Sequence, residues 1–268
     1  MAVLEGFHPL KHALRFGAQP DPVITRDAAQ LARLTEALAP DLLERVSALA
    51  REVSEEVFAQ LAPLPPSTGV IALAARPVTD VAALLAGGPG APVVLLEDPR
   101  DLGNMGACVR VAAAADAAAV LTTGGHDPWH PDALRGAAGL HFALPVARLD
   151  ALEQLLGAAR PLLAIDPDGR PLRAAARAAA RAADADDAPA AGADALDRDA
   201  LDRDPLDLGA LDARSILAFG SERAGLSEGL LQMAEERVSI PMRAGVSSLN
   251  LATSVAALLF AWRLNAQG

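Results

Sequence analysis

The sequence has only one cysteine, Cys108, in 268 residues, and it has no tyrosine. A single thiol can form neither an intramolecular disulfide nor the cysteine set of a structural zinc site, which excludes the disulfide-stapled scaffolds of secreted proteins. A chain of this length can bury a sizeable apolar core without such staples, as one large domain or two ordinary ones. We therefore expect the chain to fold in a reducing compartment.

Long hydrophobic runs are also missing. The longest apolar tracts, such as residues 109–115 and 255–262, are well short of the roughly 20 residues that span a bilayer. The first residues carry Glu5, His8 and Lys11 among isolated apolar side chains, which is not typical of a signal peptide. The sequence thus predicts a cytoplasmic protein without a membrane partner.

Positive charge is scarce. The chain has 23 lysines and arginines against 34 acidic residues, so its formal net charge is −11. Proteins that bind nucleic acid usually carry a basic balance, and bulk attraction to RNA is excluded here. Any contact with RNA must come from local clusters of basic side chains.

Several site motifs are absent as well. The sequence has no Gly-x-Gly-x-x-Gly after a strand and no Walker A motif, which argues against dinucleotide and P-loop sites. Residues 245–249 lack the final glycine of a nucleophile elbow, so a serine hydrolase is not expected. His126 and His130 are four apart, but Pro128 between them favours a loop and no third ligand is evident. We expect no metal.

Two regions differ in pattern. Residues 1–88 read as a small helix-rich α/β domain, with a helical pattern over 27–61 broken near Pro40 and a strand over 70–74. Residues 86–92 have the glycine and proline density of a linker. We predict a second domain over 92–268.

The second region alternates strands and helices, which predicts a mainly parallel α/β sheet. The expected strands cover residues 93–96, 119–122, 142–146, 162–165, 216–219 and 238–240, and the expected helices cover 106–115 and 249–264. Residues 173–214 form a low-complexity tract of alanine, aspartate and arginine. We expect a mobile insertion there, and we expect residues 180–212 to be dispensable for cofactor binding.

Three clusters follow strands of the predicted sheet, at the edge where open α/β sheets bind ligands. They cover residues 98–110, 219–226 and 239–250. Each alone has an ordinary structural explanation, namely a helix cap at Asn104, a solvated Glu222 in a turn, and a cap from Ser248 or Asn250 on the last helix.

Taken together and in order, the clusters contain Asn-x-Gly-x-x-x-Arg (104–110), Gly-x-Glu-x-x-Gly-Leu (220–226), and Ile-Pro-Met with Ser-Leu-Asn (240–242 and 248–250). This combination closely resembles the SpoU (TrmH) family of SPOUT RNA 2′-O-ribose methyltransferases over about residues 92–268, apart from the insertion. Residues 5–12 and 67–71 resemble more loosely the L30e-like substrate-binding domain of ribosomal RNA 2′-O-methyltransferases.

The resemblance implies an α/β fold in which an L30e-like domain precedes a trefoil-knotted, mainly parallel SPOUT domain that binds S-adenosyl-L-methionine. By motif position it implies these cofactor contacts: Gly220, Ile240 and Leu249, with Thr122 and Gly124 as neighbours. It also implies these catalytic residues: Asn104, Arg110, Glu222, Ser248 and Asn250. A serine common in the family segment is Ala137 here, so no hydroxyl contact is expected at that position.

Two interpretations of the role of Arg110 are open, a general base and a phosphate clamp. The family proposal makes this arginine the base that accepts the ribose proton, but a guanidinium has a pKa above about 12 and rarely gives up its proton. We favour a phosphate clamp whose orientation is fixed by Asn104, with Glu222 holding its loop and Ser248 and Asn250 ordering the substrate.

Two partners are expected. His8, Lys11, His12 and Arg15 have the spacing of one helical face, which predicts a basic stripe for RNA in an otherwise acidic protein. The last helix is apolar on nearly every side, and its own sheet can cover only part of it, so we expect a homodimer.

The predicted function is methyl transfer from S-adenosyl-L-methionine to a ribose 2′-hydroxyl of structured RNA, with ribosomal RNA favoured. Three alternatives stay open: a transfer RNA 2′-O-methyltransferase, an RNA-binding or assembly protein on the same scaffold without turnover, and a methyltransferase acting on protein or a small molecule.

Overall fold

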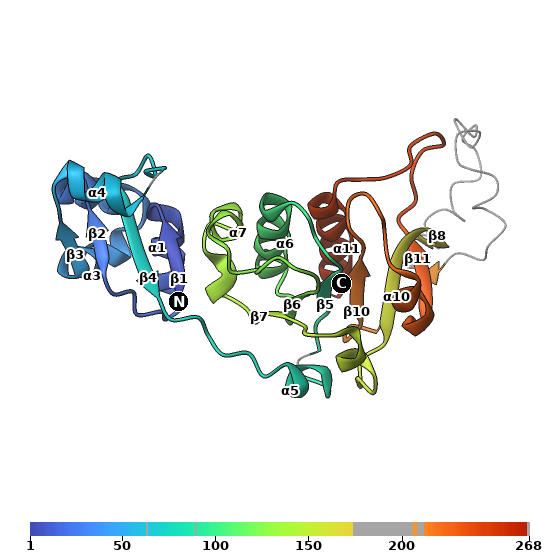
Figure 1. Cartoon of the computed structure of the whole chain (residues 1–268). Helices are drawn as coiled ribbons and strands as arrows, with labels where there is room; N and C mark the ends of the chain where they lie inside the picture. The colour runs from blue at the N-terminus through green and yellow to red at the C-terminus, as the bar shows by residue number, and fades with distance from the viewer. Residues whose placement is uncertain (63, 89, 174–205, 208–211, 267–268) are drawn as a thin grey trace.

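The structure is a computed structural model that describes residues 1–62, 64–88, 90–173, 206–207 and 212–266. Figure 1 shows a small lobe followed by a larger one, with a long connection between them. Most of the predicted insertion lies outside the described residues, as does most of the segment 180–212 that we expect to be dispensable.

The N-terminal lobe is a four-stranded mixed sheet covered by short helices. Its strands run in the order β1-β4-β2-β3, with β1 antiparallel to β4 and β2 parallel to β3. Its elements are β1 (Ala2–Glu5), α1 (Phe7–Arg15), β2 (Val23–Thr25), α2 (Ala28–Leu38), η1 (Pro40–Leu42), α3 (Leu43–Leu49), β3 (Ala50–Glu52), α4 (Glu55–Leu61) and β4 (Val70–Ala74).

The second lobe is built on a larger sheet with strand order β11-β8-β10-β5-β6-β7, and β9 pairs with the end of β8 outside this order. Every pairing is parallel. The strands are β5 (Val93–Leu96), β6 (Ala119–Thr122), β7 (Val146–Arg148), β8 (Leu162–Arg173), β9 (Leu206–Asp207), β10 (Ile216–Phe219) and β11 (Glu236–Ser239). The helices are α5 (Val81–Leu85), α6 (Leu102–Ala114), α7 (Pro131–Gly136), η2 (Leu140–Phe142), η3 (Leu152–Leu155), α10 (Glu228–Met233) and α11 (Leu251–Ala266).

Alternating residues of the central strands pack into cores on opposite faces of this sheet. Val94 and Leu96 of β5 join the cluster that includes α6, α7 and α11, whereas Val93 and Leu95 join the cluster that includes α5 and α10. All four side chains are buried, as expected for a parallel strand covered on both faces. The apolar runs of the sequence therefore became the centre of the sheet.

The predicted fold class is confirmed: a small mixed-sheet α/β domain precedes a parallel-sheet domain. The limits 1–88 and 92–268 stay a prediction, because α5 lies before residue 88 but packs its leucines in the core of the large sheet. Among the described residues, no helix has the length and apolar character needed to cross a membrane.

Some predicted boundaries were wrong. The strand expected over 142–146 is β7, which begins at Val146, because Pro145 has no N–H for a strand ladder. The helical pattern over 27–61 breaks at Pro40 as predicted, but it also contains the short edge strand β3. The helix expected from residue 106 begins at Leu102, because the Asp101 carboxylate accepts the Asn104 N–H at 2.7 Å and caps it.

The two lobes meet at α7 and the turn that follows it (Figure 1). His12 Nδ1 donates to the Ala138 carbonyl oxygen at 2.7 Å, and Arg76 pairs with Asp127 at 2.8 Å. Gly139 has φ +78°, and a Cβ there would lie 2.5 Å from Pro9 Cα, so the backbones touch at this point. These contacts hold α1 at a defined position beside the large domain.

Candidate active site

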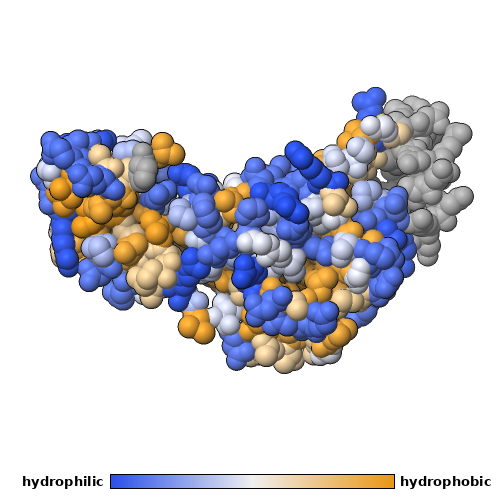
Figure 2. Space-filling view, in the orientation of Figure 1, coloured by the Kyte–Doolittle hydropathy of each residue, from blue (hydrophilic) through white to orange (hydrophobic). Residues whose placement is uncertain are grey.

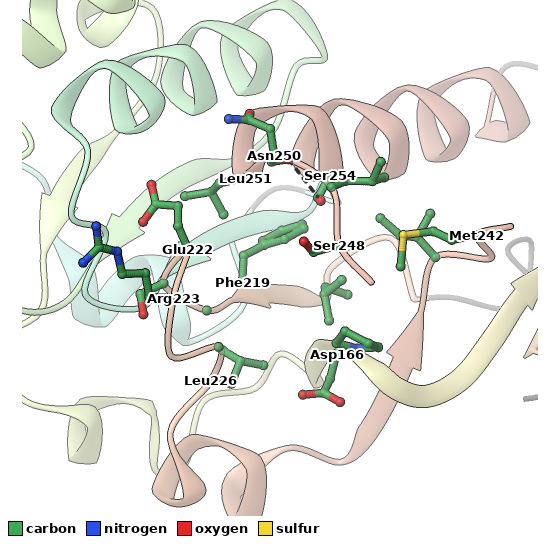
Figure 3. Close-up of a pocket in the computed structure, with 17 residues that line it drawn as sticks. Asp166, Phe219, Glu222, Arg223, Leu226, Met242, Ser248, Asn250, Leu251 and Ser254 are labelled. Carbon is green, nitrogen blue, oxygen red and sulfur yellow. Dashed lines mark hydrogen bonds between the residues drawn. The ribbon is translucent and has the colours of Figure 1, made fainter. Parts of the chain in front are cut away.

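A cavity of about 580 Å³ opens at the carboxyl ends of β10 and β11, beside residues 165–167 in the middle of β8 (Figure 3). This edge is the ligand-binding edge of an open parallel sheet. Apolar side chains cover much of its wall: Ile165, Phe219, Leu226, Ile240, Met242, Leu249 and Leu251. Polar side chains join them at several points: Asp166, Ser221, Glu222, Arg223, Ser248, Asn250 and Ser254.

The loop after β10 folds back on itself. Ser221 and Gly225 exchange two backbone hydrogen bonds of 3.1 and 3.0 Å, which closes a tight turn around Glu222. A Cβ on Gly220 would lie 2.1 Å from the Gly225 carbonyl carbon, so only glycine permits this approach. The glycines of the second motif therefore shape one wall of the cavity.

The three sequence motifs meet through one hydrogen-bonded network. Asn104 Nδ2 donates to Glu222 Oε1 at 3.1 Å, and Asn104 Oδ1 accepts from Asn250 Nδ2 at 3.0 Å. Asn250 Oδ1 in turn accepts the N–H groups of Ala252 and Thr253 and so caps α11. Figure 3 shows Glu222 and Asn250 at neighbouring positions beside the cavity. Residues far apart in sequence thus form a single rim.

The network corrects one expectation about Asn104. This side chain is neither the cap of α6 nor a partner of Arg110, because both ends of its carboxamide are occupied by Glu222 and Asn250. The helix places Asn104 in its first turn, where it faces the two loops, and Arg110 lies more than one turn later on another face.

Arg110 stands apart from the cavity. Its side chain is exposed, does not line the cavity, and forms no ion pair or hydrogen bond within the described part of the chain. Its charge acts instead on α1. Burial is the main cause that lowers the pKa of His8 and of Lys11, and the positive charge of Arg110 lowers both pKa values further. The structure therefore separates Arg110 from the other four predicted catalytic residues.

The predicted cofactor contacts divide in the same way. Gly220, Ile240 and Leu249 all line the cavity. Thr122 and Gly124 do not, because β5 separates β6 from β10 in the sheet. Thr122 is fully buried, and a Cβ on Gly124 would lie 2.2 Å from Asp98 Oδ1, so this glycine packs against the neighbouring loop.

The sequence motifs did not predict that residues of β8 line the cavity. β11 pairs with residues 163–164 and then with 170–171 of β8, and the register shift between them pushes Asp166 and Pro167 out toward the cavity. Asp166 Oδ1 is fixed there by Arg237 Nη2 at 3.0 Å. The Asp-Pro-Asp-Gly run at residues 166–169 is the sequence feature that could have indicated this irregularity. Only the pairing with β11 shows that the run bulges out of the middle of β8.

The predicted basic stripe is helical, since α1 covers all four residues, yet only half of it is free of internal partners. Arg15 binds Asp41 with two hydrogen bonds of 2.6 and 3.1 Å, and His12 holds the domain junction. His8 is exposed and Lys11 is half-buried, and neither forms an ion pair or hydrogen bond among the described residues.

The remaining candidates have structural roles. His130 caps α7 by accepting the Asp132 N–H at 3.2 Å. Ala137 is fully buried against α6, where a Cβ on Gly106 would lie 2.9 Å from its nitrogen. Across the described ranges, no group of three or more histidine, cysteine, aspartate or glutamate side chains could hold a metal ion.

Comparison with known proteins gives relatives of one kind. An uncharacterized tRNA/rRNA methyltransferase of Mycobacterium tuberculosis is 30% identical over 222 residues, which is 81% of this chain and 66% of that protein. A 23S rRNA (uridine(2479)-2′-O)-methyltransferase of Streptomyces viridochromogenes is 26% identical over 175 residues, covering 62% of this chain and 50% of the relative. The chain thus spans less than two thirds of the length of these relatives.

Solved structures share the fold. The SpoU methyltransferase AviRb from Streptomyces viridochromogenes, in complex with the cofactor AdoMet, superposes with a TM-score of 0.70 at 21% identity, covering 99% of this chain and 90% of the other. A crystal structure of an RNA 2′-O ribose methyltransferase gives a TM-score of 0.64 at 25% identity, covering 99% and 89%. These matches extend over both lobes.

The family profile of the SpoU rRNA Methylase family matches residues 91–260, which is more than half of the chain. These residues contain all three motifs that meet at the cavity. The resemblance inferred from the motifs is confirmed, and the chain belongs to the SpoU rRNA methylase family.

Proposed function

We propose that this protein transfers a methyl group from S-adenosyl-L-methionine to a ribose 2′-hydroxyl of structured RNA, with ribosomal RNA as the substrate. The observation that carries the proposal is the Glu222–Asn104–Asn250 network, which joins the three family motifs at the mouth of one cavity. Family membership alone would permit a scaffold without its site, and the contacts of Asn104 with Glu222 and Asn250 support the proposal beyond it.

The cavity fits the cofactor in size and chemistry. Its volume of about 580 Å³ lies within the range of about 300–1,000 Å³ of small-molecule sites. Gly220, Ile240 and Leu249 offer backbone groups beside an apolar wall suited to a nucleoside, and Asp166 and Ser254 offer polar contacts. When bound, S-adenosylmethionine supplies a methyl group activated by the positive charge on its sulfur.

The chain's own residues must then position the ribose. A hydroxyl is a poor nucleophile, so its oxygen needs alignment and its developing negative charge needs stabilisation. Ser248 and Asn250, at the cavity rim, order the substrate, and Glu222 holds the loop through Asn104 Nδ2 and the Arg100 N–H. Arg110 acts as a phosphate clamp and electrostatic stabiliser, because a guanidinium holds its proton too tightly for a base.

Ribosomal RNA is the favoured substrate for two reasons. The 23S rRNA methyltransferase of Streptomyces viridochromogenes is among the relatives, and the superposition with AviRb includes the N-terminal domain as well as the catalytic one. In our proposal this N-terminal domain contacts the RNA through α1, where His8 and Lys11 are the basic groups without an ion pair or hydrogen bond among the described residues.

We also propose a homodimer formed through α11. Leu251, Val255, Leu258 and Leu259 are buried against the protein's own core. Phe260 is 40% exposed and Leu264 is 70% exposed, and they share one helical face with Thr253 and Ala257. A second copy packed on this face would cover the apolar surface that the chain leaves open.

The test of the activity uses purified protein, S-adenosylmethionine with a radioactive methyl group, and unmodified ribosomal RNA or transfer RNA transcripts. We expect label in ribosomal RNA. We expect Arg110→Ala to remove it while cofactor binding stays nearly intact, because Arg110 does not line the cavity. Arg110→Lys should also fail at every pH if a bidentate clamp is required, whereas recovery at high pH would indicate a base.

The other outcomes identify the alternatives. Retention of RNA without label would indicate a binding or assembly protein, and label in transfer RNA would change the substrate class. Label that survives nuclease digestion would indicate a protein or small-molecule substrate. Full turnover by Arg110→Ala would refute the role given to this residue.

A further inference from the structure

Three basic side chains lie on α1 of the N-terminal domain and α6 of the large domain, two helices that both contact α7 and the turn after it, and none of the three lines the cofactor cavity. His8 and Lys11 come from α1, and Arg110 comes from α6. Figure 2 shows that hydrophilic residues predominate where the two lobes join on the face in view. We refer to Lys11 and Arg110 as the junction cations, and His8 accompanies them as a hydrogen-bonding group.

A shared contact brings the two helices to the same place in the molecule. His12 of α1 donates to the Ala138 carbonyl, and Gly106 of α6 packs against the adjacent Ala137, so both helices touch the same turn. Lys11 adjoins His12 on α1, and His8 lies one turn before it. Arg110 lies one turn, or about 6 Å, beyond Gly106.

The directions of the pKa shifts agree with this geometry. Burial lowers the pKa of His8 first, and the positive charges of Lys11 and then Arg110 lower it further. Burial also lowers the pKa of Lys11, together with the charges of Arg15 and Arg110, while Asp41 acts in the opposite direction. The charge of Arg110 therefore reaches both side chains of the other domain.

The junction cations have no counter-ion in the part of the chain that the structure describes. Asp41, the carboxylate that acts on Lys11, is held by Arg15 at 2.6 Å. Holding like charges together costs free energy, and a chain with 34 acidic residues could easily have neutralised them. Two unpaired cations with a histidine beside them, in such an acidic protein, fit an anionic ligand.

We propose that His8, Lys11 and Arg110 together bind one backbone phosphate of the RNA, so that both domains hold the same linkage. This inference rests on the proposed function. α6 carries Asn104 of the cavity rim at its start and Arg110 further along, so a nucleotide at the rim brings its flanking phosphates toward the junction. The N-terminal domain then fixes the position of the target nucleotide in addition to adding affinity.

The experiment measures binding of a fluorescently labelled 30-nucleotide RNA stem-loop to the full chain over a range of KCl concentrations. The variants are Lys11→Gln, Arg110→Gln and the double variant. Arg33→Gln, an exposed arginine of α2 without a partner among the described residues, is the control for lost net charge. Each single variant should lower affinity by about 3- to 10-fold, because one cation still neutralises the phosphate.

The salt dependence distinguishes one shared phosphate from two. For a shared phosphate, the slope of log affinity against log salt stays at the wild-type value in both single variants and falls by about 0.7–0.9 in the double variant. A fall in each single variant would mean separate phosphates, and variants that behave like Arg33→Gln would mean no contact. Either result overturns this inference while leaving the proposed methyl transfer to RNA intact, although the second would also remove the RNA contacts given to α1 and Arg110. Wild-type protein that binds no RNA would overturn both the inference and the proposed function.

Discussion

Replacing Asn104 tests whether the three motifs act as one unit. Asn104→Ala removes a hydrogen bond of 3.1 Å to the Glu222 carboxylate and one of 3.0 Å to Asn250. Such bonds contribute about 0.5–1.5 kcal/mol each, or more with a charged partner, but water can replace them at this half-exposed rim. The loss should be about 1–2 kcal/mol, which corresponds to a roughly 5- to 30-fold weaker affinity for S-adenosylmethionine.

The reason is preorganisation, since Glu222 and Asn250 lie on two different loops that both line the cavity. Asn104→Asp should weaken binding more than Asn104→Ala at pH 8, because it replaces a donor by a second carboxylate facing Glu222. That difference should shrink at pH 5, as protonation of one carboxyl relieves the repulsion.

Isothermal titration calorimetry with the cofactor measures these affinities directly. Asn265→Ala is the matched control, since Asn265 is exposed on α11 and has no side-chain hydrogen bond among the described residues. Wild-type cofactor affinity in Asn104→Ala would refute the reasoning, because the network would then be incidental to the shape of the cavity.

Two further predictions follow from exposed and buried side chains. Phe260→Glu combined with Leu264→Glu should convert a dimer to a monomer in sedimentation equilibrium, whereas Val57→Glu, at another exposed apolar position, should not; a wild-type monomer would contradict the dimer. His141 is fully buried, and burial lowers its pKa from 6.5 to about 4. As the pH falls, this imidazole is therefore protonated in the unfolded chain at a higher pH than in the folded protein. Unfolding free energy should therefore drop by about 2 kcal/mol between pH 7 and pH 5, and denaturant unfolding of His141→Gln should show a smaller drop than the wild type; an equal drop would refute this assignment.

Local patterns in the sequence were enough to predict the central strands. Val93–Leu96 and Ile216–Phe219 are short apolar runs between turn residues, and both form buried parallel strands as predicted. β3 was not predicted, because Ala50, Arg51 and Glu52 have no strand preference of their own and pair only because β2 lies beside them.

The candidate site was predictable in its residues but not in its contacts. Glu222, Ser248 and Asn250 were chosen by motif, and they do lie around one cavity. The partners of Asn104 could not be deduced, because they are 118 and 146 residues away in sequence. Asp166 was missed for a similar reason, since it reaches the cavity through a register shift that depends on β11.

α6 accounts for why these separate features belong to one site. Its first turn supplies Asn104 to the cavity rim, its middle supplies Gly106 to the contact with α7, and its next turn supplies Arg110 to the junction cations. A Cβ on Gly106 would lie 2.2 Å from the Ala133 carbonyl oxygen, so α6 and α7 cannot separate or slide without losing close backbone contact. Because α7 in turn holds α1 through the adjoining turn, the position of the N-terminal domain is tied to the position of the cavity rim. If the proposed function holds, this arrangement lets an acidic protein place its free cations in a defined position relative to the reacting nucleotide. Geometry then compensates for the electrostatic attraction that the net charge lacks.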